Sequence, residues 1–92
     1  MTMLDIQPSA TLRRQDVVAM NTNMILSNSG LMKKDLAKAM GLSPQSMASR
    51  LQSKADWTID ETCAAADFFG VPLMALLDEN LTPAKAMEYI KN

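Results

Sequence analysis

The 92-residue sequence contains no histidine and only one cysteine, Cys63. Without histidine it lacks the usual ligand set of a zinc site and the base of most nucleophilic catalytic centres. A single cysteine excludes an internal disulfide, which favours a reduced, cytoplasmic setting. The sequence also has no glycine-rich phosphate loop and no convergent pair of carboxylates. We therefore expect no enzyme activity, no metal and no cofactor.

Aromatic residues and long hydrophobic runs are scarce as well. The chain has one Trp, one Tyr and two Phe, although 48 % of its residues are hydrophobic. Its core must therefore be built from aliphatic residues, alanine and an unusual nine methionines, a composition that favours helices over strands. Residues 1–15 lack the apolar run that a secretory signal or a membrane span would need, so we expect no membrane partner.

The net charge of −1 argues against a nucleic-acid partner, but the charges are unevenly distributed. Residues 31–54 carry five cationic side chains and one carboxylate, a net charge of +4, whereas residues 55–92 carry −5 and residues 1–30 balance at zero. A polyanion can orient such a dipolar domain, while the acidic end limits indiscriminate binding. The alternative is that these charge blocks arise by chance on solvated faces.

The cationic stretch contains two short helical patterns separated by a turn. Gly41 can take a positive φ at the end of the first helix, and Ser43 followed by Pro44 supplies an N-cap and a first-turn proline for the second. Met47 and Leu51, four residues apart, are placed to pack on the first helix, so the polar residues between them point outward. This pattern predicts a helix-turn-helix whose second helix suits the major groove of DNA.

Apolar spacing and capping signals predict further helices on both sides of this motif. We expect helices over residues 12–28, 32–40, 44–52, 59–69, 72–77 and 83–91. Thr58 and Glu61 form a capping-box pattern at the fourth of these. We expect its inner face to use Ile59, Thr62, Ala65, Ala66 and Phe69. Trp57, just before the cap, is predicted to cover the third and fourth helices, with a partner contact as the alternative.

The chain is predicted to consist of an arm, a bundle and a tail. Residues 1–11 show no sustained period and indicate a flexible N-terminal arm; contact with a partner subunit, or with DNA through Arg13 and Arg14, is the alternative. Residues 12–78 form the helix-turn-helix domain. The helix within residues 79–92 is too short to be stable alone, so it packs either on its own core or on a second copy, as a dimer contact.

The order and spacing of these residues resemble the Cro/repressor (XRE) family of phage and bacterial helix-turn-helix domains. The similarity covers roughly residues 17–78 and rests on Leu36-Ala37, Gly41-Leu42-Ser43, the run Ser46 to Leu51, Phe69-Gly70-Val71-Pro72 and Leu76-Leu77. It implies an all-α, compact bundle of five or six helices, similar to the lambda repressor domain, that binds double-stranded operator DNA as a homodimer. It also implies a Cro-like or minimal transcriptional repressor of phage, prophage or mobile-element origin, with no evident small-molecule ligand.

The resemblance and the helical geometry together predict which residues contact DNA. The family's base-reading positions fall on Pro44, Gln45 and Ser49, and its phosphate-contacting helix start falls on Lys33 and Lys34. Helical geometry adds Arg50 to the base-reading set, and Ser43, Ser46 and Lys54 to the phosphate-contacting set. The amide of Gln45 can bond N6 and N7 of adenine, and Arg50 can reach guanine or a phosphate. Ser43 can act as a cap instead of a direct contact.

A protein-interaction module is the competing functional class. An antirepressor or an antitoxin-like subunit can use the same bundle, with its methionines forming an adaptable binding surface. Retention on DNA that is lost at about 0.3 M salt would favour the DNA-binding class. Co-purification with another protein, without retention on DNA, would favour the interaction module.

Overall fold

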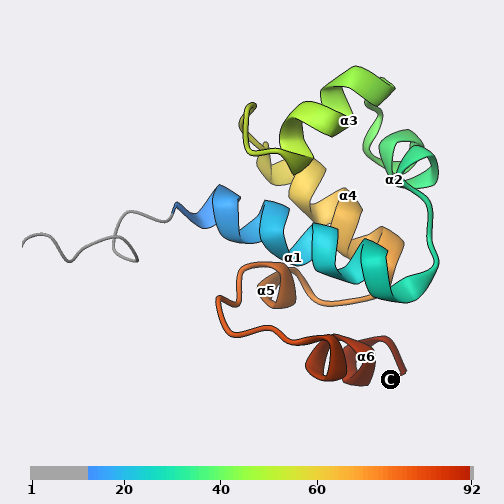
Figure 1. Cartoon of the computed structure of the whole chain (residues 1–92), viewed down its shortest axis with the longest axis vertical. Helices are drawn as coiled ribbons and strands as arrows, with labels where there is room; N and C mark the ends of the chain where they lie inside the picture. The colour runs from blue at the N-terminus through green and yellow to red at the C-terminus, as the bar shows by residue number, and fades with distance from the viewer. Residues whose placement is uncertain (1–12, 92) are drawn as a thin grey trace, which may run out of the picture.

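The structure, a computed structural model of the chain, describes residues 13–91. This part of the chain folds into six helices and no strand (Figure 1). They are α1 (Arg14–Ser29), α2 (Lys33–Met40), α3 (Pro44–Leu51), α4 (Ile59–Phe69), α5 (Leu73–Leu76) and α6 (Pro83–Lys91). The prediction of an all-α bundle of five or six helices is therefore confirmed, whereas the predicted arm over residues 1–11 lies outside the described residues.

The capping residues explain where the helices begin. α1 begins two residues later than predicted, because the extended backbone of Arg13 forms its N-cap and the Arg13 amide donates to the Asp16 carboxylate over 3.3 Å. At α4 the predicted capping box is present: the Glu61 amide donates to Thr58 Oγ1 over 3.0 Å, and the Thr58 amide donates to Glu61 Oε1 over 3.1 Å. At both helix starts a carboxylate accepts from an N-cap amide that is otherwise left without a partner.

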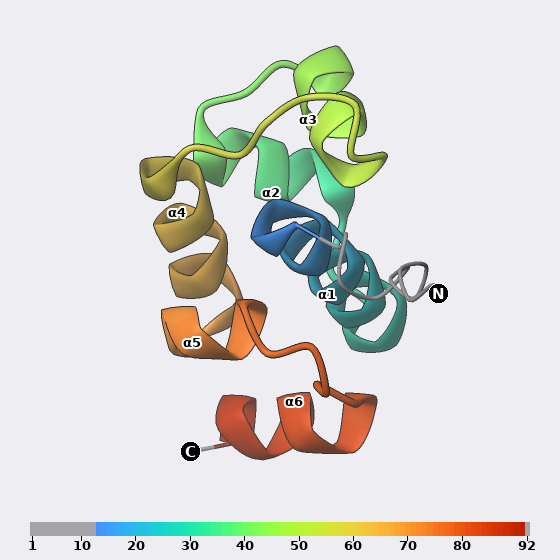
Figure 2. The same cartoon turned by 90° about the vertical axis from the view of Figure 1, so that its left-hand side faces the viewer.

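The core lies where α2 and α4 meet and extends to α1 and α5. Leu36 and Leu76 are completely buried, and Met47 is 1 % exposed. Phe69 and Val71 close the core at the end of α4. Two of the six helices, α3 and α6, lie at opposite ends of the described molecule (Figure 2). None of the described helices is both long and apolar enough to span a membrane.

The first residue of α4 departs from the predicted core. Ile59 was expected to face inward with Thr62 and Phe69, but its side chain is 74 % exposed while the other two are buried. Ile59 does lie on the same side of α4, because it lines a surface groove together with Thr62. The apolar stripe of α4 therefore extends beyond the part of the helix that neighbouring helices cover. The spacing of apolar residues alone does not show where that cover ends.

The helix α6 packs on the core of its own chain, the first of the two alternatives for the tail, and the dimer contact stays a prediction. Leu81 and Ala86 are buried in the common core, and Tyr89 and Ile90 pack against it. The Thr82 hydroxyl caps α6 by accepting from the Lys85 amide over 3.2 Å. The tail does not cover α3, because it lies at the other end of the molecule (Figure 2).

Candidate nucleic-acid interface

The helices α2 and α3 and the turn between them form the predicted helix-turn-helix. Gly41 has a φ of 72°, in the left-handed region that favours glycine, and the Leu42 amide returns to the Ala37 carbonyl over 2.8 Å. Ser43 Oγ accepts from the Ser46 amide over 3.2 Å, and Pro44 takes the first helical position of α3. These local signals fix the sharp turn that separates the two helices.

The outward face of α3 matches the prediction at its start and differs further along. Pro44 and Gln45 are exposed, as expected for base-reading positions. Ser49, expected to be the most outward residue, is half-buried, and Ala48 is exposed instead. The chain folds back directly after α3, where the Lys54 amide donates to the Ser49 carbonyl over 2.8 Å. Lys54 itself is exposed at this end of α3.

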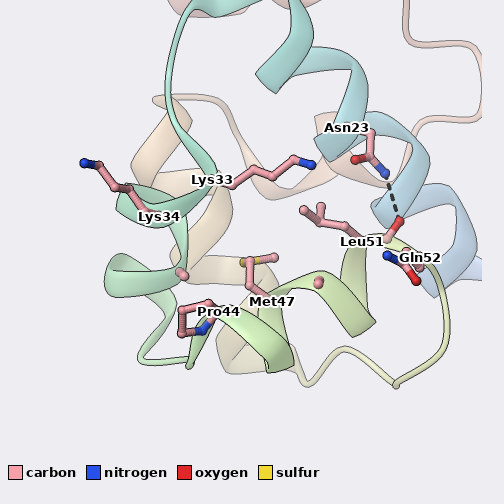
Figure 3. A pocket seen from close by; sticks show the side chains of 9 residues that line it. Asn23, Lys33, Lys34, Pro44, Met47, Leu51 and Gln52 are labelled. Atoms are coloured by element: carbon pink, nitrogen blue, oxygen red, sulfur yellow. Dashed lines mark hydrogen bonds between the residues drawn. The ribbon is translucent and has the colours of Figure 1, made fainter.

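A groove of about 480 Å³ separates the start of α2 from the face of α3. Its apolar wall includes Met47 and Leu51, and its polar lining includes Lys33, Lys34 and Asn23. Figure 3 shows the Lys33 side chain extending toward Asn23, whereas Lys34 points the opposite way. Asn23 Nδ2 donates to the Leu51 carbonyl over 2.9 Å and so attaches the end of α3 to α1. Lys33 and Lys34, two of the three lysines predicted to contact phosphates, thus point in different directions from the groove.

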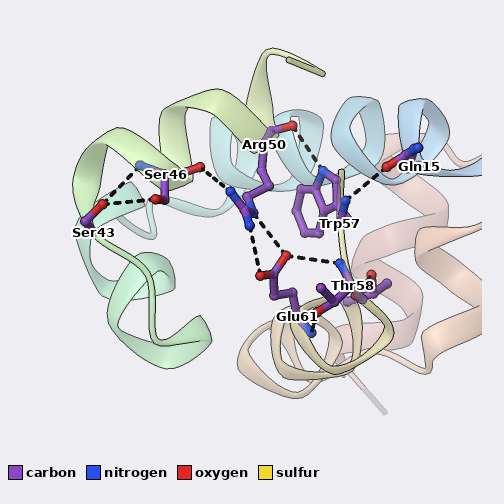
Figure 4. Close-up of polar contacts among 8 residues, drawn as sticks. Gln15, Ser43, Ser46, Arg50, Trp57, Thr58 and Glu61 are labelled. Atoms are coloured by element: carbon purple, nitrogen blue, oxygen red, sulfur yellow. Dashed lines mark hydrogen bonds and ion pairs between the residues drawn. The ribbon is translucent and has the colours of Figure 1, made fainter. Parts of the chain in front are cut away.

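Arg50 does not occupy the outward position that its predicted base-reading role requires. Its Nε and Nη2 atoms donate to the two Glu61 oxygens over 3.0 and 3.1 Å, and its side chain is only 19 % exposed (Figure 4). This hydrogen bond to Glu61 is the main reason that the pKa of Arg50 is raised. The guanidinium is therefore directed at α4 and its charge is compensated inside the protein. In this arrangement Arg50 joins α3 to α4 instead of facing outward, and the base contact expected for it stays a prediction.

The two serines of the turn are bonded to each other. Besides accepting from the Ser46 amide, Ser43 Oγ donates to Ser46 Oγ over 3.1 Å. Ser43 thus forms the N-cap of α3, the alternative to a direct DNA contact. Ser46 is half-buried, so a phosphate would have to compete with an existing hydrogen bond at either hydroxyl.

Two polar residues of α1 that the sequence did not single out also support the interface. Gln15 Oε1 accepts from the Trp57 amide over 3.0 Å, and the Trp57 indole N–H donates to the Arg50 carbonyl over 3.0 Å (Figure 4). Together with Asn23, Gln15 links α1 to the end of α3 and the segment after it. Trp57 packs against the core, which confirms the packing role predicted for it. The sequence carries no local signal for Gln15 or Asn23, because their hydrogen-bond partners lie 42 and 28 residues away.

No protein-family model, curated protein or solved structure matches this chain. The interpretation of this face therefore depends on its own geometry and charge.

Proposed function

We propose that the protein is a DNA-binding transcriptional regulator that inserts α3 into the major groove. The observation that carries this proposal is the distribution of unpaired cations. Within residues 13–90, Arg13, Arg14, Arg50 and Lys85 all form ion pairs with carboxylates. The cationic side chains in that range that form none are Lys33, Lys34, Lys38 and Lys54. These four lysines belong to the helix-turn-helix segment.

Unpaired lysines favour binding to phosphates because their charge is not already compensated. Each phosphate that a lysine neutralises releases condensed counterions from the duplex, which makes the affinity fall as salt rises. Lys33 and Lys34 also stand in the first turn of α2, where free amides and the helix dipole favour an anion. We assign these two lysines, with Lys54 beyond α3, to the DNA backbone.

Sequence preference is assigned to the start of α3. Gln45 is exposed in the first turn, and its amide matches the donor and acceptor pair of an adenine edge. Pro44 and Ala48 are exposed beside it and offer small apolar contacts, such as to a thymine methyl group. Ser49 has a short side chain and is half-buried at the edge of this exposed face. A good bidentate pair discriminates between bases by about 1–3 kcal/mol, so we expect Gln45 to dominate the preference.

The resemblance to the Cro/repressor family extends the proposal to the form of the binding site. A two-fold dimer binds an inverted repeat whose half-site centres are about 34 Å apart, one turn of the double helix. We propose this mode of binding and the role of a minimal repressor for the present chain. Selection of bound duplexes from a random pool tests the symmetry directly, since a dimer of this kind recovers one inverted repeat.

The proposed function is tested by comparing three variants on a selected duplex and on random DNA. Lys33→Ala should weaken binding to both alike and reduce the slope of log K against log salt by about one. Gln45→Ala should weaken binding to the selected duplex more than to random DNA. Lys85→Ala is the matched control, because it removes the same charge from α6 at the far end of the molecule and should change neither.

The result that would overturn the proposal is the absence of salt-dependent binding to any duplex. If the protein then co-purifies with another protein through the same α2–α3 face, the interaction module replaces the DNA-binding regulator. Equal losses for Lys33→Ala, Gln45→Ala and Lys85→Ala would likewise remove the distinction on which the site assignment depends.

A further inference from the structure

We propose that the groove between α2 and α3 binds a small amphiphilic anion, an apolar molecule that carries a carboxylate, and that this ligand releases the protein from DNA. The regulatory part rests on the proposed function, because it names the class of signal that ends DNA binding. Ligand binding itself is measured without DNA, so the two can fail separately. The proposal departs from the resemblance to the Cro/repressor family, which implies no evident small-molecule ligand.

The groove has a volume and a lining that suit a small ligand. It measures about 480 Å³, within the range of about 300–1,000 Å³ that is typical of small-molecule sites. Its apolar lining consists of Ala37 of α2 and of Pro44, Met47, Ala48 and Leu51 of α3. Small-molecule sites are lined mainly by such side chains, and a few polar groups fix the orientation of the ligand. An apolar ring system therefore suits this wall.

The start of α2 supplies the groove with a positive charge that no described carboxylate compensates. Lys33 lines the groove and extends toward Asn23 (Figure 3), and it forms no ion pair within the described residues. The Asn23 amide hydrogens are already used, because Nδ2 donates to the Ala19 and Leu51 carbonyls over 2.9 Å each. Met32, the N-cap of α2, forms no side-chain cap, so the helix start beside Lys33 also favours an anion. Lys33 is therefore the group that selects a negatively charged ligand.

This charge and this wall together favour an amphiphilic anion. A phosphate ion would pair with the lysine but leave the apolar lining uncovered, whereas a neutral apolar molecule would leave the lysine unpaired. A carboxylate with an apolar body satisfies both. The lining includes Lys33, Pro44 and Ala48, which the proposed function assigns to DNA. A ligand in the groove therefore occupies the same contacts as the duplex and competes with it.

Ligand binding is tested on the full chain with two probes of the same shape, 2-naphthoate and the neutral 2-naphthylmethanol. The methionine methyl signals in the NMR spectrum report the site. The signal of Met47, which lines the groove, should shift with 2-naphthoate, and that of the exposed Met20 of α1, outside the groove, should not. We expect a dissociation constant of about 1 mM or lower for 2-naphthoate and about tenfold weaker binding of the alcohol.

Two variants and one control assign the contacts. Lys33→Ala should weaken binding of 2-naphthoate by about tenfold and change that of the alcohol little, because it removes the charge. Ala48→Leu should weaken both probes, because a leucine at this exposed position fills part of the groove and is compatible with the helix. Lys38→Ala is the matched control: it removes the same charge from α2 outside the groove lining and should change neither probe.

Three results would overturn the proposal: no shift of Met47 with either probe, equal binding of acid and alcohol, or equal effects of Lys33→Ala and Lys38→Ala. Shifts of Met47 that depend on protein concentration alone would place a second copy of the chain in the groove and overturn it as well.

The regulatory part is tested by competition at constant ionic strength. 2-Naphthoate at ten times its dissociation constant should weaken binding of the selected duplex by about tenfold. Unchanged duplex binding at that concentration would overturn this part. If the protein without ligand binds no duplex, the proposed function fails, whereas binding of 2-naphthoate in the groove would still stand.

Discussion

The Arg50 guanidinium and the Glu61 carboxylate form a two-fold hydrogen-bonded ion pair that joins α3 to the start of α4. The two N–O distances are 3.0 and 3.1 Å, and the side chains are 19 % and 13 % exposed. The same carboxylate completes the cap of α4 by accepting from the Thr58 amide. One acidic side chain therefore contacts both α3 and the start of α4, and the orientation of α3 depends on it.

Removing this ion pair should lower the free energy of unfolding. We expect a loss of about 1–3 kcal/mol for Glu61→Gln, since hydrogen bonds to charged groups contribute in that range and the partner guanidinium stays in place. Glu79→Gln is the matched control: it breaks the Arg14–Glu79 pair, whose side chains are 65 % and 46 % exposed, and should cost less than about 1 kcal/mol. Urea denaturation of the three proteins measures both differences.

The same pair separates a positioning role from a base contact for Arg50. If Arg50 positions α3, Arg50→Ala and Glu61→Gln should weaken DNA binding in the same direction. If Arg50 instead contacts bases in the complex, Glu61→Gln should free the guanidinium and strengthen binding, while Arg50→Ala should alter the preferred sequence. The second result would contradict a positioning role for Arg50 and support the base contact predicted from the sequence.

Stability should also depend on pH through this carboxylate. Partial burial acts to raise the pKa of Glu61, but the hydrogen bonds from Arg50 and from the Thr58 amide outweigh it, so the pKa lies below its ordinary value of 4.5. Because the folded pKa is lower than the unfolded one, the stabilisation is complete above the unfolded value and is lost as the pH falls through the folded value.

Two further carboxylates act in the same direction. Hydrogen bonds from Arg13 and from Lys85 lower the pKa of Asp16 and of Asp78, respectively, below the ordinary 3.8. We therefore expect the urea midpoint to fall between about pH 6 and about pH 3, with a shallower fall for Glu61→Gln, which no longer titrates at that site. A wild-type midpoint that is constant over this range would contradict the role of the three carboxylates.

The end of α3 contains a backbone position that should respond to the size of one side chain. Ser53 follows the helix with a φ of 61°, the left-handed region in which residues other than glycine are disfavoured. Ser53→Gly and Ser53→Ala both remove the hydroxyl, so their difference reports only the β-carbon. We expect the glycine variant to be more stable than the alanine variant by about 1 kcal/mol. Equal unfolding midpoints would mean that this turn relaxes in the alanine variant.

Local signals allowed the helices and their caps to be predicted from the sequence. Ser43-Pro44 and Thr58 through Glu61 are recognisable because a cap and the amide it satisfies lie within three residues of one another. The two helices of the helix-turn-helix and the burial of Met47 followed from such signals. The observed helix bounds differ from the predicted ones by one or two residues. At α1 the difference arises because Arg13 forms an unexpected N-cap.

Contacts between distant residues could not be predicted in this way. The buried Asn21 donates to the Leu76 and Asp78 carbonyls over 2.9 Å each and thereby holds the end of α5, but 55 and 57 residues separate it from these acceptors. The capping role of Glu61 could be predicted from the sequence, but its ion pair with Arg50 could not. Ile59 has the correct period for burial but no neighbouring helix to cover it. In each case the sequence specifies the chemistry of a side chain, and the tertiary arrangement selects its partner.

The packing of α6 can be tested by mutation. A tail that packs within its own chain and a tail that packs only on a second copy respond differently to the loss of a buried side chain. Leu81 is 8 % exposed against the common core, so Leu81→Ala should lower the free energy of unfolding by about 2–3 kcal/mol. Met87, which is 37 % exposed on the same helix, is the control, and Met87→Ala should cost less than about 1 kcal/mol. The loss at Leu81 should not depend on protein concentration, because the contact lies within one chain. A loss that disappears on dilution would place the packing partner of α6 in a second molecule instead.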